Sequence, residues 1–157
     1  MRHVTFETAS ELDTERLGGV LARSLPETLT IALQGTLGAG KTRLVQALAA
    51  ALDIDPATVT SPTFVLCQHH SGRRLLYHLD AYRMKDLDEF LELGVEEYFA
   101  GPGITLIEWA ERVADCLPLD HLVVRIEITG PESRQFDLSA TGPLSERVLE
   151  RLAQELA

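Results

Sequence analysis

The chain contains no asparagine, only two cysteines and few basic residues. Cys67 and Cys116 lack zinc-type spacing and cannot form a disulfide framework, so a reduced, cytoplasmic setting is expected. No apolar run approaches the ~20 residues that cross a membrane, and the first residues lack a secretory signal. The 14 Lys and Arg against 24 Asp and Glu give a net charge of −10. This charge argues against non-specific binding to nucleic acid or to an anionic membrane.

The length of the chain and its apolar patterns indicate the class of fold. At 157 residues, the chain is near the usual size of one domain, and we predict a single domain over residues 1–157. Residues 28–33 form a nearly continuous apolar run, as in a strand covered on both faces. This run favours an α/β fold with a mostly parallel central sheet. Turn residues at 71–74 and 130–133 predict two added β-hairpins, formed by 64–70 with 75–80 and by 122–129 with 134–140.

Helical spacing predicts helices between these strands. A helix start at Ser10 and Asp13 places Leu12, Leu17, Val20 and Leu21 on one buried stripe. Further helices are expected after the glycine-rich loop described below, after Asp86 with Leu87, Phe90 and Leu91 buried, over 110–117, and from Pro143 onward.

Residues 35–42, GTLGAGKT, match G-x-x-x-x-G-K-[ST] between a predicted strand and a predicted helix. The glycines permit positive φ, so that backbone N–H groups can surround a phosphate. Lys41 offers a charge for the β- and γ-phosphates, and Thr42 offers a hydroxyl to Mg²⁺. A turn that only caps a helix is the structural alternative. The predicted nucleotide-binding residues of this segment are Gly35, Thr36, Leu37, Gly38, Ala39, Gly40, Lys41, Thr42 and Arg43.

Two carboxylates follow apolar strands and are predicted to face the phosphates. Asp80 ends residues 75–79, and Glu108 ends residues 104–107. A carboxylate at such a strand end is placed to hold a metal ion or to orient water. We assign Glu108, with Thr42, to Mg²⁺, and Asp80 to the positioning of water. The sequence leaves open which of the two is the direct ligand.

Three other residues each have two possible roles. Thr63, in the polar segment 59–64, is placed as a γ-phosphate sensor or as part of an ST-turn. Trp109 follows Glu108 and is a core aromatic or a mobile, partner-contacting side chain. Arg134 has either a binding role, in which it stacks on a base or neutralises phosphate, or no role beyond that of a solvated charge on the hairpin.

Five motifs occur along the chain in this order: GTLGAGKT (35–42), SPTF (61–64), YHLDAYR (77–83), LGVEEYF (93–99) and IEWAER (107–112). Together they resemble the TsaE (YjeE) family, the small ATPase component of the bacterial machinery that makes threonylcarbamoyladenosine in tRNA. The resemblance spans roughly residues 3–140. One residue departs from the family pattern, because Thr36 stands where the family usually has aspartate.

The resemblance implies a three-layer α/β P-loop NTPase that hydrolyses Mg-ATP in concert with TsaD and TsaB. It implies modification of adenosine at position 37 of tRNA, with the tRNA contacted only through the complex, and no membrane. Thr14 and Arg134 match positions near the adenine. Positions that the family uses for binding, Mg²⁺ and turnover are matched by Lys41, Thr42, Asp80, Glu108 and Trp109, of which Lys41, Asp80 and Glu108 are the expected catalytic residues.

The absence of asparagine bears on the choice of nucleotide. The N-K-x-D element with which GTPases read guanine cannot be present, so ATP is favoured over GTP. A small-molecule kinase would need an arginine-bearing lid and an acceptor pocket, and no such insertion is evident in the sequence. A non-catalytic module that binds nucleotide and docks a partner is the other alternative. The sequence does not predict the oligomeric state.

Overall fold

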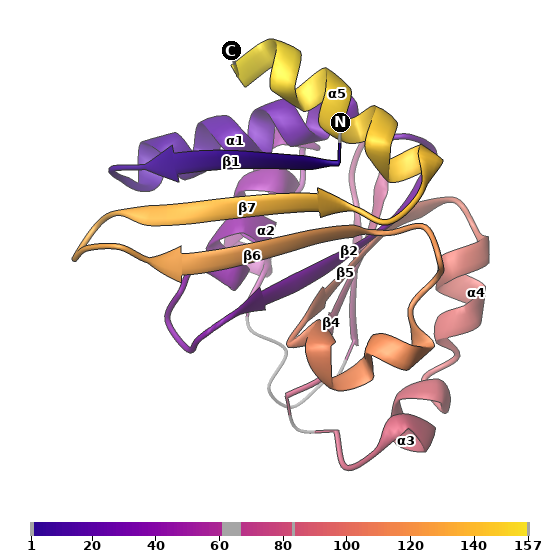
Figure 1. The fold of residues 1–157 in the computed structure, drawn as a ribbon. Coiled ribbons are helices and arrows are strands. Elements are labelled where there is room, and N and C mark those ends of the chain that lie inside the picture. Colours follow the sequence, from indigo (N-terminus) through magenta and orange to yellow (C-terminus); the bar gives the residue numbers. More distant parts are fainter. Residues whose placement is uncertain (1, 61–66, 83, 157) are drawn as a thin grey trace.

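The computed structural model describes residues 2–60, 67–82 and 84–156. Its strands form one seven-stranded sheet in the order β1-β7-β6-β2-β5-β4-β3 (Figure 1). The strands are β1 (His3–Thr8), β2 (Thr28–Gly35), β3 (Cys67–Ser71), β4 (Leu75–Asp80), β5 (Gly103–Glu108), β6 (Leu122–Ile128) and β7 (Arg134–Ala140). The helices are α1 (Glu11–Ser24), α2 (Lys41–Ala51), α3 (Leu87–Leu91), α4 (Val95–Ala100) and α5 (Pro143–Leu156), with 3₁₀ turns η1 (Pro56–Thr58) and η2 (Ala110–Cys116).

The centre of the sheet is parallel and its edges are antiparallel. Strands β6, β2, β5 and β4 run in the same direction. On one side β7 pairs with β6 and β1 pairs with β7, both antiparallel, and on the other side β3 pairs antiparallel with β4. The predicted parallel centre with added hairpins is therefore confirmed, except that residues 64–66 of the first hairpin lie outside the described residues.

Helices cover both faces of the central strands, which gives the three-layer arrangement. Alternate residues of β2 point to opposite faces, so Ile31 packs in the core beneath α1, α2 and α5, whereas Ala32 packs in the core beneath α3, α4 and η2. All six residues of β5 are buried. In the described part of the chain, we find no helix that is both long and apolar enough to cross a membrane.

Two predicted buried positions are wrong. Leu12 lies on the first turn of α1 and is 74% exposed, because α1, which packs on α2 and α5, is buried only from Thr14 onward. Leu91, at the end of α3, is also exposed. The helix expected over 110–117 is a 3₁₀ helix at Ala110–Cys116 with a kink at Val113. Its buried residues Ala110 and Val113 are three positions apart, which matches the 3₁₀ period.

Asp120 caps the N-terminus of α5 from the loop before β6. Its Oδ2 accepts a hydrogen bond from Leu144 N at 2.7 Å, and its Oδ1 accepts from Ser145 N at 3.0 Å and Ser145 Oγ at 2.6 Å. Burial alone would raise the pKa of Asp120, but these hydrogen bonds outweigh burial and lower the pKa below its usual value. The ionised side chain therefore stabilises the folded state.

We expect Asp120→Ala to lower the free energy of unfolding at pH 7 by about 1–2 kcal/mol, the usual cost of a lost helix cap. Because the folded-state pKa is lowered, this stabilisation is present above the unfolded-state pKa of about 3.9 and is lost as the pH falls through the folded-state value. Denaturant unfolding of both proteins at several pH values measures the effect. The two stabilities should converge below about pH 4.

Asp115→Ala is the matched control, because Asp115 is an exposed aspartate in η2. This variant should stay within about 0.5 kcal/mol of the parent. Equal losses in the two variants, or a loss for Asp120→Ala that does not change with pH, would show that the capping account is wrong.

Candidate functional site

The carboxyl ends of three parallel strands meet at one edge of the sheet. Strand β2 ends at Gly35, β5 ends at Glu108 and β4 ends at Asp80. The register pairs Leu33 with Glu108 and Asp80 with Glu108. The glycine-rich loop (residues 35–42) and both predicted carboxylates therefore lie together, where open α/β sheets bind their ligands.

The glycine-rich loop needs glycine for two separate reasons. At Gly35, an added Cβ atom would lie 2.8 Å from the carbonyl oxygen of Ile126 and 3.1 Å from Cβ of Ala39, so β6 approaches too closely for a side chain. Gly40 forms the N-cap of α2 with φ of 111°, in the left-handed region that favours glycine. The loop thus turns directly into the N-terminus of α2, where backbone N–H groups are free to meet an anion.

The Lys41 side chain is folded back onto the loop. Its Nζ donates to the carbonyl oxygens of Gly35 at 2.7 Å and Thr36 at 3.0 Å, and it lies 4.0 Å from the centroid of the Trp109 ring. Lys41 is 5% exposed. Burial lowers the pKa of Lys41, and the nearby charges of Glu108, Glu111 and Asp80 oppose this shift.

Thr42 and Glu108 are in direct contact, while their shared role toward Mg²⁺ stays a prediction. Thr42 Oγ1 lies 2.9 Å from Oε2 and 3.1 Å from Oε1 of Glu108, which is buried. A third residue joins them, because His78 Nε2 lies 2.5 Å from Glu108 Oε2. The sequence analysis did not predict this contact between His78 and Glu108. The available signal was its position two residues before Asp80, which puts both side chains on one face of the strand.

Asp80 lies beside Glu108 on the neighbouring strand and is buried. Its Oδ1 accepts a hydrogen bond from the backbone N–H of Tyr82 at 2.8 Å. Burial raises the pKa of Asp80, and the charge of Glu108 adds to this effect, while the Tyr82 hydrogen bond opposes it. A carboxylate with a raised pKa is a better proton acceptor, which suits a residue that orients water.

Trp109 has an unusual backbone conformation next to the site. Its φ of 60° and ψ of 37° place it in the left-handed region, which is strained for a bulky residue. The ring is half-buried between Lys41 Nζ and the exposed ring of Tyr82, whose centroid is 4.8 Å away. Trp109 therefore touches the loop lysine, while its contact with a partner stays a prediction.

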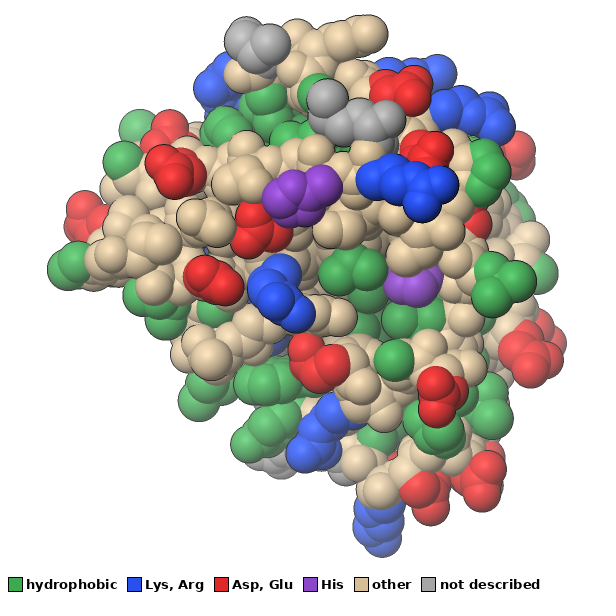
Figure 2. Space-filling model, viewed as in Figure 1, with side chains coloured by type: hydrophobic (Ala, Val, Ile, Leu, Met, Phe, Trp, Pro, Cys, Tyr) green, Lys and Arg blue, Asp and Glu red, His purple; other side chains and the backbone are tan. Residues whose placement is uncertain are grey.

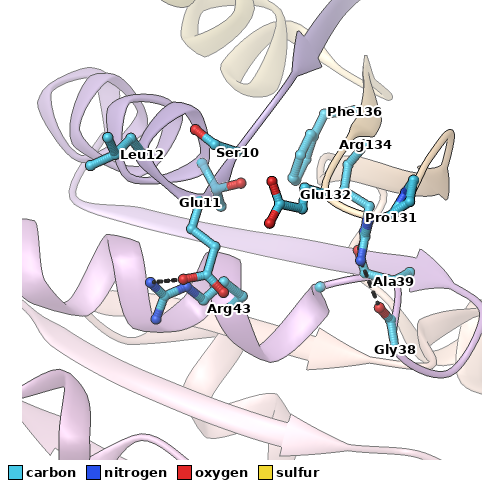
Figure 3. Close-up of a pocket in the computed structure, with 12 residues that line it drawn as sticks. Ser10, Glu11, Leu12, Gly38, Ala39, Arg43, Pro131, Glu132, Arg134 and Phe136 are labelled. Atoms are coloured by element: carbon cyan, nitrogen blue, oxygen red, sulfur yellow. Dashed lines mark hydrogen bonds and ion pairs between the residues drawn. The ribbon is translucent and has the colours of Figure 1, made fainter.

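A cavity of about 520 Å³ lies on one side of the glycine-rich loop, between the start of α1 and the β6–β7 turn (Figure 3). Its size is typical of small-molecule pockets. Thr14, Arg43 and Arg134 all line it, as expected for residues near a base or its sugar. Glu132 also points toward it, whereas the Glu11 carboxylate pairs with Arg43 Nη2 at 2.9 Å.

Arg134 is tied to the loop instead of extending into solvent. Its Nε donates to the carbonyl oxygen of Ala39 at 3.0 Å, and its other nitrogens donate to Gly130, Ser133 and Gly38. The solvated-charge interpretation of Arg134 is therefore wrong. Whether its planar guanidinium stacks on a base stays a prediction.

The other predicted residues lie in the loop itself or outside the described residues. Leu37 is 83% exposed, and the backbone carbonyl of Thr36 accepts from Lys41. Thr63 lies outside the described residues. The structure brings the remaining predicted residues together in two groups. The group at the sheet edge is Lys41, Thr42, Asp80, Glu108 and Trp109. The group that lines the cavity is Thr14, Gly38, Ala39, Gly40, Arg43 and Arg134.

The chain is similar to known proteins over most of its length. The family model described as "Threonylcarbamoyl adenosine biosynthesis protein TsaE" matches residues 8–136. The tRNA threonylcarbamoyladenosine biosynthesis protein TsaE of Treponema pallidum (strain Nichols) is 40% identical over 130 residues, which cover 83% of this chain and 96% of the relative. The protein of the same name from Bacillus subtilis (strain 168) is 34% identical over 155 residues, which cover 98% of this chain and 96% of the relative.

A solved structure is also similar to this chain over almost its whole length. The crystal structure of Bacillus subtilis YdiB matches with a TM-score of 0.83 and 29% sequence identity, covering 99% of this chain and 97% of that chain. The fold, the matching relatives and the five motifs lead to one conclusion. The chain belongs to the TsaE family, which is involved in tRNA threonylcarbamoyladenosine biosynthesis.

Proposed function

We propose that this chain binds and hydrolyses Mg-ATP as the ATPase component of the tRNA threonylcarbamoyladenosine machinery. One observation carries the proposal. Lys41, Thr42, Asp80 and Glu108 converge at the end of the parallel strands, beside the N-terminus of α2. This set combines a mobile cation, a hydroxyl, two carboxylates and free backbone N–H groups, which are the parts that phosphoryl transfer to water requires.

The residues present fit Mg²⁺. The hydroxyl of Thr42 and the carboxylate of Glu108 are hard oxygen donors in contact with each other. Within residues 2–60, 67–82 and 84–156, no group of three or more His, Cys, Asp or Glu is arranged to hold a metal ion. Mg²⁺ is usually held by one or two protein groups plus phosphate oxygens and water, so two protein donors suffice. When bound, Mg²⁺ would neutralise charge on the phosphates.

The lysine and the loop have complementary parts in binding. Lys41 Nζ donates to two loop carbonyls and lies over the Trp109 ring, with the carboxylates of Glu108, Glu111 and Asp80 nearby. Phosphate oxygens are stronger acceptors for an ammonium group than carbonyl oxygens, so Lys41 would exchange these contacts for the β- and γ-phosphates. The backbone N–H groups at the start of α2 would hold the same phosphates.

Asp80 is the residue proposed to orient the attacking water. It is buried next to Glu108, and its Oδ1 is fixed by the Tyr82 N–H. A group that orients water and balances charge acts mainly in the transition state, so its removal should slow the reaction more than it weakens binding.

The cavity beside the loop is proposed to take the adenosine end of ATP. Thr14 is buried at its wall, and Arg134 and Arg43 supply planar guanidinium groups that can lie against a base or its sugar. The preference for ATP over GTP rests on the absence of asparagine from the chain.

A second, open hollow of about 760 Å³ supports gating by a partner protein. It lies on the other side of the loop, and its lining includes Leu37, Trp109, Arg125 and Ile128. Leu37 and Ile128 are exposed apolar side chains. A partner that filled this hollow would touch both the loop and the tryptophan that covers Lys41. TsaD and TsaB are the proposed partners.

Contact with tRNA is proposed to be indirect. The net charge of −10 repels a polyanion. On the face seen in Figure 2, the described basic side chains are interspersed with acidic ones instead of being gathered in one patch. Such a surface supports recognition of the tRNA by other members of the complex.

Lys41→Ala should abolish binding of Mg-ATP. Binding at a hundredfold excess over Kd stabilises a protein by about 2.7 kcal/mol, so the parent should melt at a higher temperature with Mg-ATP and the variant should not. The chain's other lysine, Lys85, is exposed, and Lys85→Ala is the matched control. A normal ligand-induced rise in Lys41→Ala would show that the loop assignment is wrong.

Asp80→Asn should bind Mg-ATP with near-normal affinity but hydrolyse it at least about tenfold more slowly in single turnover. The isosteric change keeps the volume and removes the proton acceptor. Asp88→Asn, at an exposed position of α3, is the control and should have the parent rate. An unchanged rate in Asp80→Asn would remove this residue from the chemical step.

The purified chain should hydrolyse ATP slowly alone and at least several-fold faster with the TsaD–TsaB pair. Steady-state phosphate release at fixed Mg-ATP measures the effect, and Lys41→Ala should abolish the stimulated rate. An unchanged rate with the partners, or the same increase with an unrelated acidic protein, would favour the non-catalytic nucleotide-dependent binding module.

A further inference from the structure

His78 is a polar residue buried in the middle of an apolar strand. It is 0% exposed, and its neighbours Leu76 and Leu79 in β4 belong to the core. Its Nε2 lies 2.5 Å from Glu108 Oε2. Among the described residues, Nδ1 of His78 has no hydrogen-bond partner. Burying an imidazole with one nitrogen unpaired costs stability, so packing alone would be served better by an aliphatic side chain.

The histidine acts on a carboxylate that is already shared. Glu108 Oε2 is 2.9 Å from Thr42 Oγ1 as well as 2.5 Å from His78 Nε2. A carboxylate can only accept, so both the hydroxyl and the imidazole N–H donate to it. Glu108 comes from β5, His78 from β4 and Thr42 from α2. The imidazole and the hydroxyl therefore hold Glu108 from two different elements, and both of them contact its Oε2.

Glu108 would have other orientations without His78. A glutamate side chain has three rotatable bonds, and Thr42 alone contacts its end from the loop side. The remaining charged neighbours named above are Lys41, which donates to loop carbonyls, and Asp80, which repels Glu108. Only the imidazole supplies a hydrogen-bond donor from the sheet side among the contacts of this carboxylate in the described residues.

We propose that His78 is a positioning residue that presets the Glu108 carboxylate against Thr42 for Mg²⁺. The inference rests on the proposed function, because it assigns a role toward the ion that Thr42 and Glu108 would hold. Hydrogen bonds from outside the ligand shell fix the orientation of metal-binding carboxylates, and their loss typically weakens metal affinity by about 10–100-fold.

The test is the Mg²⁺ dependence of nucleotide binding, measured with a non-hydrolysable ATP analogue. His78→Leu removes the donor and keeps an apolar side chain of similar size, while His78→Gln keeps an N–H donor. We expect the half-saturating Mg²⁺ concentration to rise about 10–100-fold in His78→Leu and less in His78→Gln. Affinity for the analogue in EDTA should stay the same, because His78 touches no part of the glycine-rich loop except through Glu108.

Thr105→Val is the matched control. Thr105 is buried in β5, and its hydroxyl also has no partner among the described residues, so the variant alters the same sheet without touching Glu108. Its Mg²⁺ dependence should equal that of the parent. If His78→Leu does not fold, His78→Met, a flexible side chain without the donor, takes its place in the same titration.

A double-mutant cycle separates positioning from a general structural role. In a Glu108→Gln background, His78→Leu should produce little further change in the half-saturating Mg²⁺ concentration, because its effect passes through Glu108. Full additivity, or a parent-like Mg²⁺ dependence in His78→Leu, would overturn the proposal. If the parent itself showed no Mg²⁺-dependent binding of the analogue, the proposed function would fail, which is a different result.

Discussion

The in-register parallel pairing of β2, β5 and β4 is the constraint on which the site depends. It brings the last residue of each strand to the same edge, so Gly35, Glu108 and Asp80 meet although they are distant in the sequence. Because β5 is buried along its whole length, it cannot shift without disturbing both cores. A slip of one residue would also turn Glu108 to the opposite face of the sheet.

The glycine-rich loop offers positive groups within an acidic chain. The net charge of −10 opposes a highly negative ligand such as the proposed Mg-ATP, so overall attraction cannot help its binding. The glycine-rich loop compensates locally through the N-terminus of α2 and the buried ammonium of Lys41. The same ammonium is stabilised by Glu108, Glu111 and Asp80 before any ligand arrives.

The sequence predicted those parts that depend on local spacing or on strand ends. The loop is one continuous motif, and Asp80 and Glu108 could be placed because parallel strands share one carboxyl edge. The role of His78 could not be predicted, since its partner lies 30 positions away on another strand. The predicted burial of Leu12 was wrong for another reason, because the helical period gives the buried face of a helix but not the residue at which its packing begins. The bonds from Arg134 to the loop likewise depend on the docking of a hairpin.

The Arg134 contact has a consequence for how the molecule folds. The hydrogen bond to Ala39 joins residues that are 95 positions apart, and β7 must pair with β6 before it can form. Contacts of such long sequence separation generally form late, because the chain between them must first be ordered. The loop motif is therefore local in sequence, but its final shape is completed only when the C-terminal hairpin has docked. A nascent chain that ended before β7 would carry the whole motif without its finished geometry.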